Sequence, residues 1–518
     1  MIRITKYLFS ALLIVLSFGL DAQMKYPTSV ETVLQKTKGN RGELEKVLNY
    51  FYKTGDSLKI KAINFLISNM DIHSSYNYYW ADSIGRRLSY NELDYPDFDS
   101  SIRAFDALKK VTPKIHPVSN IYRDIDSIKG DYLIENTEMA FEDWKQPFAK
   151  SISFEDFCEN LLPYRISVEP LQNWRPYYKK YFKNLNDSIK EKGVEEAVSN
   201  ITYDCNKWFT STFNKEQRNE PLPRLSALQL LFRKKGACED YTGLGVFEAR
   251  ALGIAATEEL VPYWATSSAS HFFDVAISSP KNVPFEQLST AVATNFILPR
   301  EPGKVLRLTY SKQTNVLANF TAKENIPSGF LRSINYKDVT EQYWESEDIN
   351  CLLFSSFLSN NLAEENKRIA YACVFNTLDW RPIWWGKVKK DSVLFTKMGK
   401  GVVYLPMYYQ KERLVPAGYP VAVGYHHTMV LKPDTINIHS IHLKEQDKYL
   451  KYRKGKNYKL YYWDNRWKLV GSQTAKDKTE ELVFENIPTN SLLLMVPEYT
   501  LHKERPFMIT DEGERIWW

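Results

Sequence analysis

Apolar residues recur at intervals of three and four positions along much of the first 200 residues. The segments 29–34, 42–51, 59–70 and 151–162 carry this spacing, which places their apolar side chains on one face of a helix. Prolines separate several of these segments and interrupt the helical pattern. The region 23–199 is therefore predicted to be mainly helical.

Between residues 200 and 300, helical spacing alternates with short apolar runs. A helix is predicted to begin at Cys238 and to end at Gly253, a residue type that commonly ends helices. Apolar and aromatic runs follow at 259–264 and 271–277 and predict strands. This mixture predicts an α+β core over 200–300.

Alternation of apolar and polar residues dominates beyond residue 300. Runs such as 305–310, 369–375 and 401–409 are separated by turn residues, which is typical of short strands. Strands at this density predict one or two β-sandwich or jelly-roll modules. A proline-containing turn near residue 434 divides them, so we expect modules at 301–434 and 435–518.

The N-terminus carries the features of an export signal. Arg3 and Lys6 precede an apolar run over 7–20, and Ala22 then offers a small residue suited to cleavage. The run is shorter than the roughly 20 residues that a membrane-spanning helix needs. We expect residues 1–22 to be a cleaved signal peptide and the mature chain to be periplasmic or secreted, with no integral membrane segment; an uncleaved anchor is the alternative.

Charge and composition narrow the class of protein. The 68 basic and 62 acidic residues nearly cancel, leaving a formal charge of +6, which does not favour a nucleic-acid partner. The 14% aromatic content is typical of β-rich modules whose faces carry large rings. We therefore expect a folded multi-domain protein without a nucleic-acid function; its oligomeric state is left open.

Five cysteines are present, and an oxidising compartment permits disulfides between them. Cys158 with Cys205, and Cys351 with Cys373, are pairings that would leave Cys238 free. Buried free thiols are the alternative for these four residues.

The segment around Cys238 suggests nucleophilic chemistry. A thiol in the first turn of a helix lies near unpaired backbone N–H groups and the positive end of the helix dipole, and both favour the thiolate. Gly236 allows a tight turn before it. A general base is also needed, and His271 is the only histidine between His116 and His426.

The segment from Gly236 to Ile254, Gly-Ala-Cys-Glu-Asp-Tyr-Thr-Gly-Leu-Gly-Val-Phe-Glu-Ala-Arg-Ala-Leu-Gly-Ile, resembles the cysteine segment of the transglutaminase-like superfamily. The longer layout resembles exported multi-domain members from Bacteroidetes. The resemblance implies a papain-like α+β core with Cys238 as nucleophile and His271 as general base. The fold class expected for the whole chain is α+β: a helical N-terminal region, this core, and β-sandwich or jelly-roll modules.

The third member of the implied triad is less well matched. The family's acidic residue corresponds best to Glu286 in Asn-Val-Pro-Phe-Glu, which would accept the Nδ1–H of His271. Asp274 is the alternative, but it lies three residues along the same strand and would point to the opposite face. A third reading is that no residue orients the histidine.

No cofactor or metal is expected. Four histidines lie close together in sequence, but their spacing on strands does not converge on one ion and no acidic or cysteine cluster accompanies them; they are His426, His427, His439 and His442.

The resemblance implies an enzyme that hydrolyses or transfers amide bonds of peptides, cell-wall peptides or glycopeptides through a Cys-His-acid triad. The altered His-Phe-Phe-Asp segment beginning at His271 supports an alternative. In it the core is catalytically inactive and the protein is a scaffold that binds glycan or peptide through its C-terminal β modules.

Overall fold

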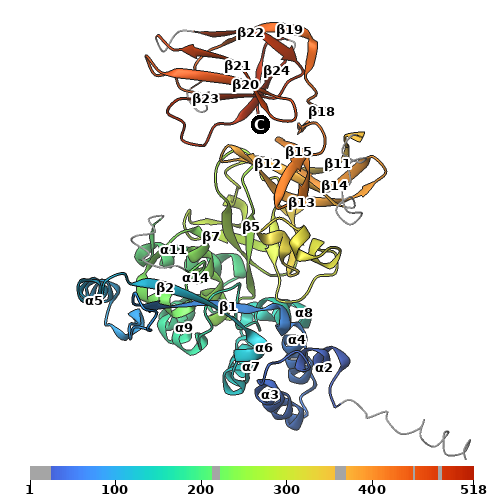
Figure 1. Cartoon of the computed structure of the whole chain (residues 1–518). Helices are drawn as coiled ribbons and strands as arrows, with labels where there is room; N and C mark the ends of the chain where they lie inside the picture. Colours follow the sequence, from blue (N-terminus) through green and yellow to red (C-terminus); the bar gives the residue numbers. More distant parts are fainter. Residues whose placement is uncertain (1–24, 213–221, 356–368, 447–449, 477–480, 511) are drawn as a thin grey trace, which may run out of the picture.

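The structure is a computed structural model, and it describes residues 25–212, 222–355, 369–446, 450–476, 481–510 and 512–518. Helices and strands both contribute, so the expected α+β class is confirmed. Figure 1 shows helices at the N-terminal end in blue, a mixed core in green, and strand-rich modules in orange and red. The signal peptide expected at 1–22 lies outside the described residues and stays a prediction.

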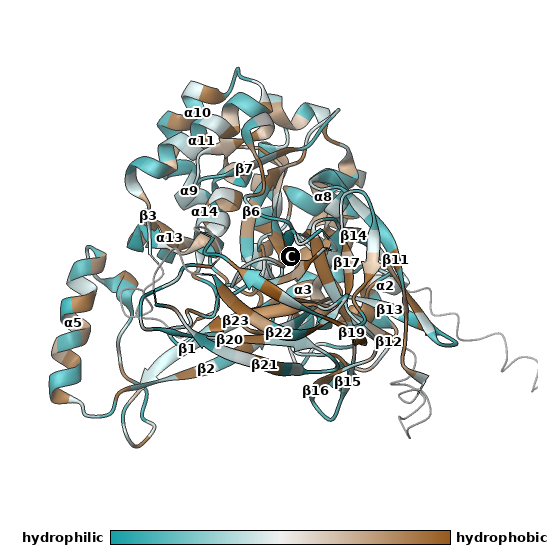
Figure 2. Cartoon of the chain, turned by 90° about the horizontal axis from the view of Figure 1, so that it is seen from above, coloured by the Kyte–Doolittle hydropathy of each residue, from teal (hydrophilic) through white to brown (hydrophobic). Residues whose placement is uncertain are grey.

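The N-terminal region is helical as predicted, because the four segments with helical spacing coincide with α2, α3, α4 and α8. The helices up to the core are α2 (Thr28–Leu34), α3 (Arg41–Thr54), α4 (Ser57–Asn69), α5 (Phe98–Val111), α6 (Asp124–Ser127), α7 (Gly130–Asp143), α8 (Phe154–Asn160), α9 (Arg175–Tyr181), α10 (Lys183–Ile189) and α11 (Val194–Trp208). Two antiparallel strands that the spacing did not predict, β1 (Ser74–Ala81) and β2 (His116–Arg123), cross this region and flank α5 in sequence. Figure 2 shows α5 set apart from the body of the molecule.

Short 3-10 helices connect many of these elements. They are η1 (Met70–Ile72), η2 (Glu92–Asp94), η3 (Pro147–Ser151), η4 (Ala293–Asn295), η5 (Leu317–Asn319), η6 (Lys323–Asn325), η7 (Phe330–Arg332) and η8 (Thr340–Gln342).

The core is an antiparallel six-stranded sheet in the order β10-β9-β5-β6-β7-β8. Its strands are β5 (Ala256–Val261), β6 (His271–Ala276), β7 (Val283–Glu286), β8 (Ala291–Val292), β9 (Leu306–Leu308) and β10 (Tyr336–Asp338). Because β9 and β10 join this sheet, the core extends past the boundary expected at residue 300.

Helices cover one face of the core sheet. The helices α14 (Cys238–Ala251) and α11 share a buried cluster with apolar side chains of β6, β7 and β8. The helix α13 (Ala227–Arg233) precedes α14, and β4 (Lys235–Gly236) lies between them in the chain. β4 pairs in parallel with β3 (Thr210–Ser211), which precedes α13. Val275 of β6 and Ile277, directly after the strand, instead pack with the N-terminal helices.

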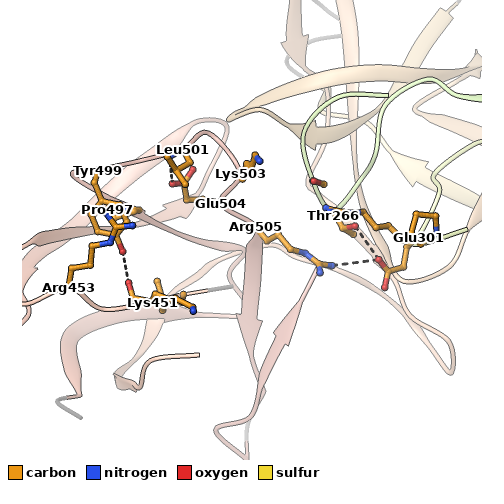
Figure 3. A pocket seen from close by; sticks show the side chains of 14 residues that line it. Thr266, Glu301, Lys451, Arg453, Pro497, Tyr499, Leu501, Lys503, Glu504 and Arg505 are labelled. Atoms are coloured by element: carbon orange, nitrogen blue, oxygen red, sulfur yellow. Dashed lines mark hydrogen bonds and ion pairs between the residues drawn. The ribbon is translucent and has the colours of Figure 1, made fainter. Parts of the chain in front are cut away.

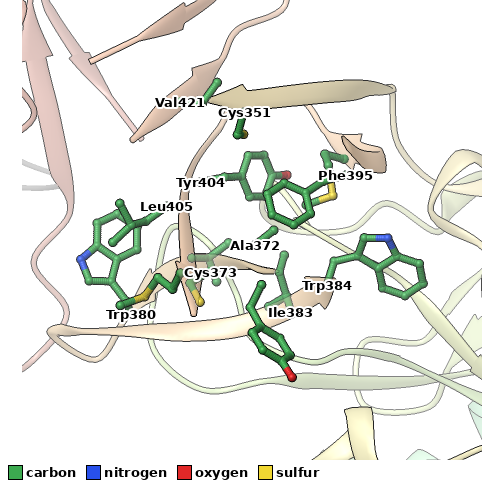
Figure 4. Packing of buried hydrophobic residues seen from close by; sticks show 14 of the residues in the cluster. Cys351, Ala372, Cys373, Trp380, Ile383, Trp384, Phe395, Tyr404, Leu405 and Val421 are labelled. Atoms are coloured by element: carbon green, nitrogen blue, oxygen red, sulfur yellow. The ribbon is translucent and has the colours of Figure 1, made fainter. Parts of the chain in front are cut away.

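An eight-stranded antiparallel sheet follows the core. Its strands are β11 (Ser346–Leu352), β12 (Ile369–Asn376), β13 (Asp379–Lys389), β14 (Ser392–Gly399), β15 (Val402–Gln410), β16 (Arg413–Pro416), β17 (Val421–Val423) and β18 (Thr428–Val430). Its strands contribute to a buried hydrophobic cluster. Figure 4 shows part of this cluster, including Trp380, Ile383, Phe395 and Tyr404. All five cysteines of the chain are free thiols, so neither disulfide pairing considered above is present.

The C-terminal module combines a two-stranded sheet, β19-β22, with a five-stranded sheet in the order β21-β20-β23-β24-β25. Its strands are β19 (Asp434–Leu443), β20 (Asn457–Trp463), β21 (Trp467–Thr474), β22 (Leu482–Thr489), β23 (Leu493–Pro497), β24 (Pro506–Ile509) and β25 (Arg515–Trp517). Apolar side chains of both sheets share one buried cluster. The first strand of this module begins at Asp434, and the module boundary expected near residue 434 stays a prediction.

Among the described residues, no helix combines the length and the apolar character needed to cross a membrane.

Candidate functional site

The chain places Cys238 at the first position of α14, as the sequence predicts. Asp240 folds back so that its carboxylate accepts a hydrogen bond of 2.9 Å from the backbone N–H of Ala237, the residue that caps the helix. A Cβ at position 236 would lie 2.7 Å from an Asp240 carboxylate oxygen, so only glycine fits beside this cap. The tight approach that fixes the start of α14 therefore depends on Gly236.

The Cys238 thiol is not activated in the way that the helix dipole suggests. Its Sγ donates to Glu239 Oε2 at 3.4 Å, and the side chain is partly buried. Burial and, after it, the Glu239 carboxylate raise the pKa of the Cys238 thiol to about 12, against the opposing effect of the nearby Arg224. The expected shift toward thiolate is wrong for this arrangement, because desolvation and a like charge outweigh the helix N-terminus.

His271 and Glu286 lie together, as the sequence predicts. His271 Nε2 lies 3.3 Å from Glu286 Oε1, and the two side chains are 13% and 15% exposed. The nitrogen that faces the carboxylate is Nε2 and not the expected Nδ1, and the contact is an ion-pair distance without an aligned hydrogen bond. Burial lowers the pKa of His271, while Glu286 raises it, so the imidazole is neutral at pH 7.

Two aromatic rings stack with the His271 imidazole. The Trp264 ring stacks with it at 5.5 Å and the Phe273 ring at 5.8 Å. Phe273 in turn contacts Phe296 and Tyr343, with ring centres 4.8 and 5.2 Å away. These two outer rings also line a cavity of about 970 Å³. A series of contacting aromatic rings therefore connects the imidazole to this cavity.

Asp274 lies on the other face of the sheet. A Cβ on Gly245 of α14 would come within 2.5 Å of an Asp274 carboxylate oxygen, so this carboxylate packs directly against the helix. Asp274 is fully buried, and this burial raises its carboxyl pKa well above the usual value. The expectation that Asp274 points away from His271 is confirmed, because residues 271 and 274 of one strand face opposite sides.

Cys238 and His271 lie at the same end of the core. The chain returns from α14 along β5, whose last residue, Val261, pairs with His271. The start of the helix and the start of β6 are thereby brought to one edge of the sheet. Among the residues that the structure describes, however, no hydrogen bond joins the Cys238 thiol to the His271 ring. His271 shares its side of β6 with Phe273, whereas Asp274 and Ala276 face α14, so the imidazole lies on the sheet face opposite the helix that carries Cys238. The structure thus pairs the histidine with Glu286 and leaves the thiol bonded to Glu239.

Arg224 connects the two halves of the candidate site, and the sequence offered no signal for it beyond one basic residue in a proline-rich loop. Its guanidinium donates to the carbonyl of Glu239 at 2.8 Å and pairs with Glu258 at 2.6 Å. It also stacks over the ring of Phe272, which is next to His271, at 4.6 Å. Arg224 therefore places a buried positive charge between the neighbours of the thiol and of the imidazole.

Arg250, near the end of α14, anchors the helix to its neighbours through hydrogen bonds. It is 2% exposed, and its guanidinium donates to the carbonyls of Asn160, Ala256 and Arg165 at 2.9, 3.0 and 2.8 Å. Burial lowers the pKa of Arg250 to about 9. The side chain joins the end of the helix to the N-terminal region and to β5, which fixes the direction in which α14 crosses the sheet.

In the described part of the chain, no group of three histidine, cysteine or acidic side chains is arranged to hold a metal ion.

Comparison with known proteins adds no identification. No family model matches the chain, and no curated protein matches it.

Proposed function

We propose that this protein is a cysteine hydrolase or acyltransferase with a transglutaminase-like core, acting on amide bonds of peptides or glycopeptides. The observation that carries the proposal is the neutral, carboxylate-paired His271 at the edge of the sheet where α14 begins with Cys238. A neutral imidazole is the form that accepts a proton from a thiol.

In the proposed reaction, the Cys238 sulfur attacks the amide carbonyl carbon and its proton passes to His271. The imidazole, with Nε2 toward Glu286, receives that proton on Nδ1 and is stabilised as a cation by the carboxylate. The backbone N–H of Cys238, at the first helical position, is a candidate donor to the oxyanion. The protonated His271 then gives its proton to the departing amine, and water or another amine resolves the thioester.

The thiol must leave Glu239 before it can react. We propose that substrate entering the site displaces this 3.4 Å contact and that the start of β6 turns, so that His271, which faces away from α14 in this structure, approaches the sulfur. Two properties favour such a movement: the sulfur–carboxylate contact is long, and a hydrogen bond donated by a thiol is weak.

The substrate proposed is a peptide, a cell-wall peptide or a glycopeptide. The cavity of about 970 Å³ beside Phe296 and Tyr343 has the size of a site for several residues of a peptide. The predicted signal peptide at 1–22 supports a periplasmic or secreted location, where such substrates are available.

One observation favours a second candidate function, a catalytically inactive scaffold. The raised pKa of Cys238 and its bond to Glu239 are what a core without chemistry would also have. The protein would then bind glycan or peptide through its C-terminal β modules.

The test is amine release from a mixture of peptides incubated with the purified protein, measured by mass spectrometry. Cleavage or transfer that is lost in Cys238→Ala and in His271→Ala supports the enzyme, with the buried Cys205→Ala as a matched control that keeps activity. Binding without any turnover, unchanged in Cys238→Ala, supports the scaffold instead.

A further inference from the structure

A second cavity, of about 540 Å³, lies between the core and the C-terminal module. Thr266, Ser267 and residues 299–301 form its core side, while residues 450–453 and 497–505 form the other side. Figure 3 shows Arg505 reaching across it toward Glu301. Because His271 follows Ser267 by a few residues, the same loop leads from this cavity to the candidate site.

Positive charge dominates the lining, with five cations and two carboxylates; the cations are Arg300, Lys451, Arg453, Lys503 and Arg505. Glu301 already accepts a hydrogen bond of 3.1 Å from Thr266 and faces Arg505 at 3.9 Å. Among the described residues, no carboxylate lies within ion-pair distance of Arg300, Lys451 or Lys503. The cavity therefore carries positive charge that no carboxylate in the described part of the chain pairs with.

Two of the cations are held in place by tyrosines. The Arg453 guanidinium lies 4.0 Å above the ring of Tyr499. The hydroxyls of Tyr499 and Tyr458 both donate to the carbonyl of Lys451, at 2.5 and 2.9 Å, and lie 3.0 Å from each other. The backbone that carries Lys451 and Arg453 is thus fixed before any ligand arrives, which reduces the entropy lost on binding.

The lining favours an acidic peptide over an acidic saccharide. A saccharide needs acceptors for its hydroxyls, and the lining offers few: Glu301 is already paired with Thr266, and Glu504 accepts from the backbone N–H of Leu501 with Oε1, which leaves only its buried Oε2 without a partner. Apolar side chains complete the lining, among them Leu450, Pro497 and Leu501, and these suit peptide side chains.

We propose that this cavity binds a peptide that carries carboxylates, and that it selects acidic peptides for the candidate active site. The substrate preference rests on the proposed function, whereas the binding itself does not. Lysine and arginine side chains pair with carboxylates through charge-assisted hydrogen bonds, and their attraction weakens as salt increases.

The experiment measures binding of a fluorescein-labelled Ala-Glu-Ala-Glu-Ala peptide to full-length Cys238→Ala protein by anisotropy, at low and at moderate salt. The expected result is saturable binding that weakens with salt and is about tenfold weaker for the peptide with Gln in place of Glu. Lys451→Gln and Lys503→Gln should each weaken binding about threefold to tenfold, while Lys459→Gln on the exposed face of β20 should leave it unchanged.

Equal binding of the Gln peptide, unchanged binding in both cavity variants, or tighter binding of a galacturonate trimer would overturn the proposal. The two proposals also fail separately. If the acidic peptide binds but wild-type protein never cleaves a peptide, the proposed function fails and the binding site stands. If wild-type protein cleaves peptides without preference for acidic ones, the selection proposed here fails and the enzyme stands.

Discussion

At the scale of single residues, burial and, after it, the carboxylate next to the candidate nucleophile keep its thiol protonated. Glu239 accepts from the Cys238 thiol and raises its pKa, and Arg224 is the nearby charge that lowers it. Sequence position alone predicts a thiolate that the helix N-terminus stabilises. The balance of burial and charge in the folded protein reverses that direction.

Replacing this carboxylate should make the thiol more reactive. Glu239→Gln removes a negative charge beside the sulfur, so the pKa of Cys238 should fall by about one unit and its alkylation by iodoacetamide at pH 8 should accelerate about tenfold. Rates are followed by mass spectrometry of the Cys238 peptide. Glu195→Gln, on the exposed side of α11, is the control, and equal rates in the two variants would show that Glu239 does not act on the thiol.

The carboxylate that assists His271 can be identified by its effect on the pH profile. Glu286 raises the pKa of His271, so Glu286→Gln should lower that pKa and move the acid limb of a Cys238 acylation profile to lower pH. The rate at the plateau should fall about tenfold to 100-fold, because the imidazolium loses its partner.

Asp274→Asn is the matched variant, since Asp274 is buried, carries a raised pKa and packs against α14. It should leave the acid limb in place. If the acid limb moves in Asp274→Asn and stays in place in Glu286→Gln, the assignment of Glu286 as the third member of the triad is wrong.

At the scale of elements, α14 lies so close to β6 that its own composition is constrained. A Cβ at Gly245 would collide with the Gln287 side chain and approach Asp274 at 2.5 Å. A Cβ at Gly243 would meet only Leu230, at an ordinary 3.5 Å. A larger residue therefore fits at position 243 of α14 but not at position 245 unless the neighbouring side chains move.

Gly245→Ala should destabilise the protein by about 1–3 kcal/mol, because side chains beneath the helix must move. Gly243→Ala should be neutral or stabilise it by up to about 1 kcal/mol, since alanine favours the helix. Thermal unfolding of both variants checks this, and a loss of stability in Gly243→Ala as large as that in Gly245→Ala would refute the close approach.

At the scale of the whole molecule, a buried histidine joins the N-terminal region to the core. His73 Nε2 lies 2.8 Å from the carbonyl of Tyr310, and the two rings stack at 4.4 Å. Burial and, after it, the positive charge of Arg165 lower the pKa of His73 to about 3. The junction therefore contains a histidine that must stay neutral.

This junction should make the protein sensitive to acid. The folded pKa of about 3 lies below the unfolded value of 6.5, so the contribution of His73 is complete above pH 6.5 and is lost as pH falls toward 3. Each pH unit in that window costs about 1.4 kcal/mol.

The melting temperature of His73→Gln should consequently fall less than that of wild type between pH 7 and pH 5. His116→Gln, on exposed β2, should behave as wild type. Parallel losses in all three proteins would show that His73 does not control the acid sensitivity.

The elements that the sequence predicted correctly are those governed by local pattern. Cys238 begins its helix, the N-terminal segments with helical spacing are helices, and the alternating runs beyond residue 300 are strands. Strand partners are set by distant segments, so the addition of β9 and β10 to the core sheet was not predicted. Arg224 and the raised pKa of Cys238 depend on packing between segments and have no local signature.

The predictions for pairs of site residues were likewise correct where local pattern decides and wrong where packing decides. Alternation along a strand correctly separated Asp274 from His271, because the period of two residues is a property of the backbone. The choice of ring nitrogen facing Glu286 was wrong, because it depends on how Trp264 and Phe273 stack on the imidazole.

The most direct test of the central claim is the rate at which a peptide p-nitrophenyl ester acylates Cys238, measured by intact mass in wild-type protein and in His271→Ala. General-base assistance contributes roughly 100-fold or more, so His271→Ala should acylate at least about 100 times more slowly near neutral pH. His116→Ala should match wild type. Equal rates in wild type and His271→Ala would contradict the account, since Cys238 would then react as an unassisted thiol.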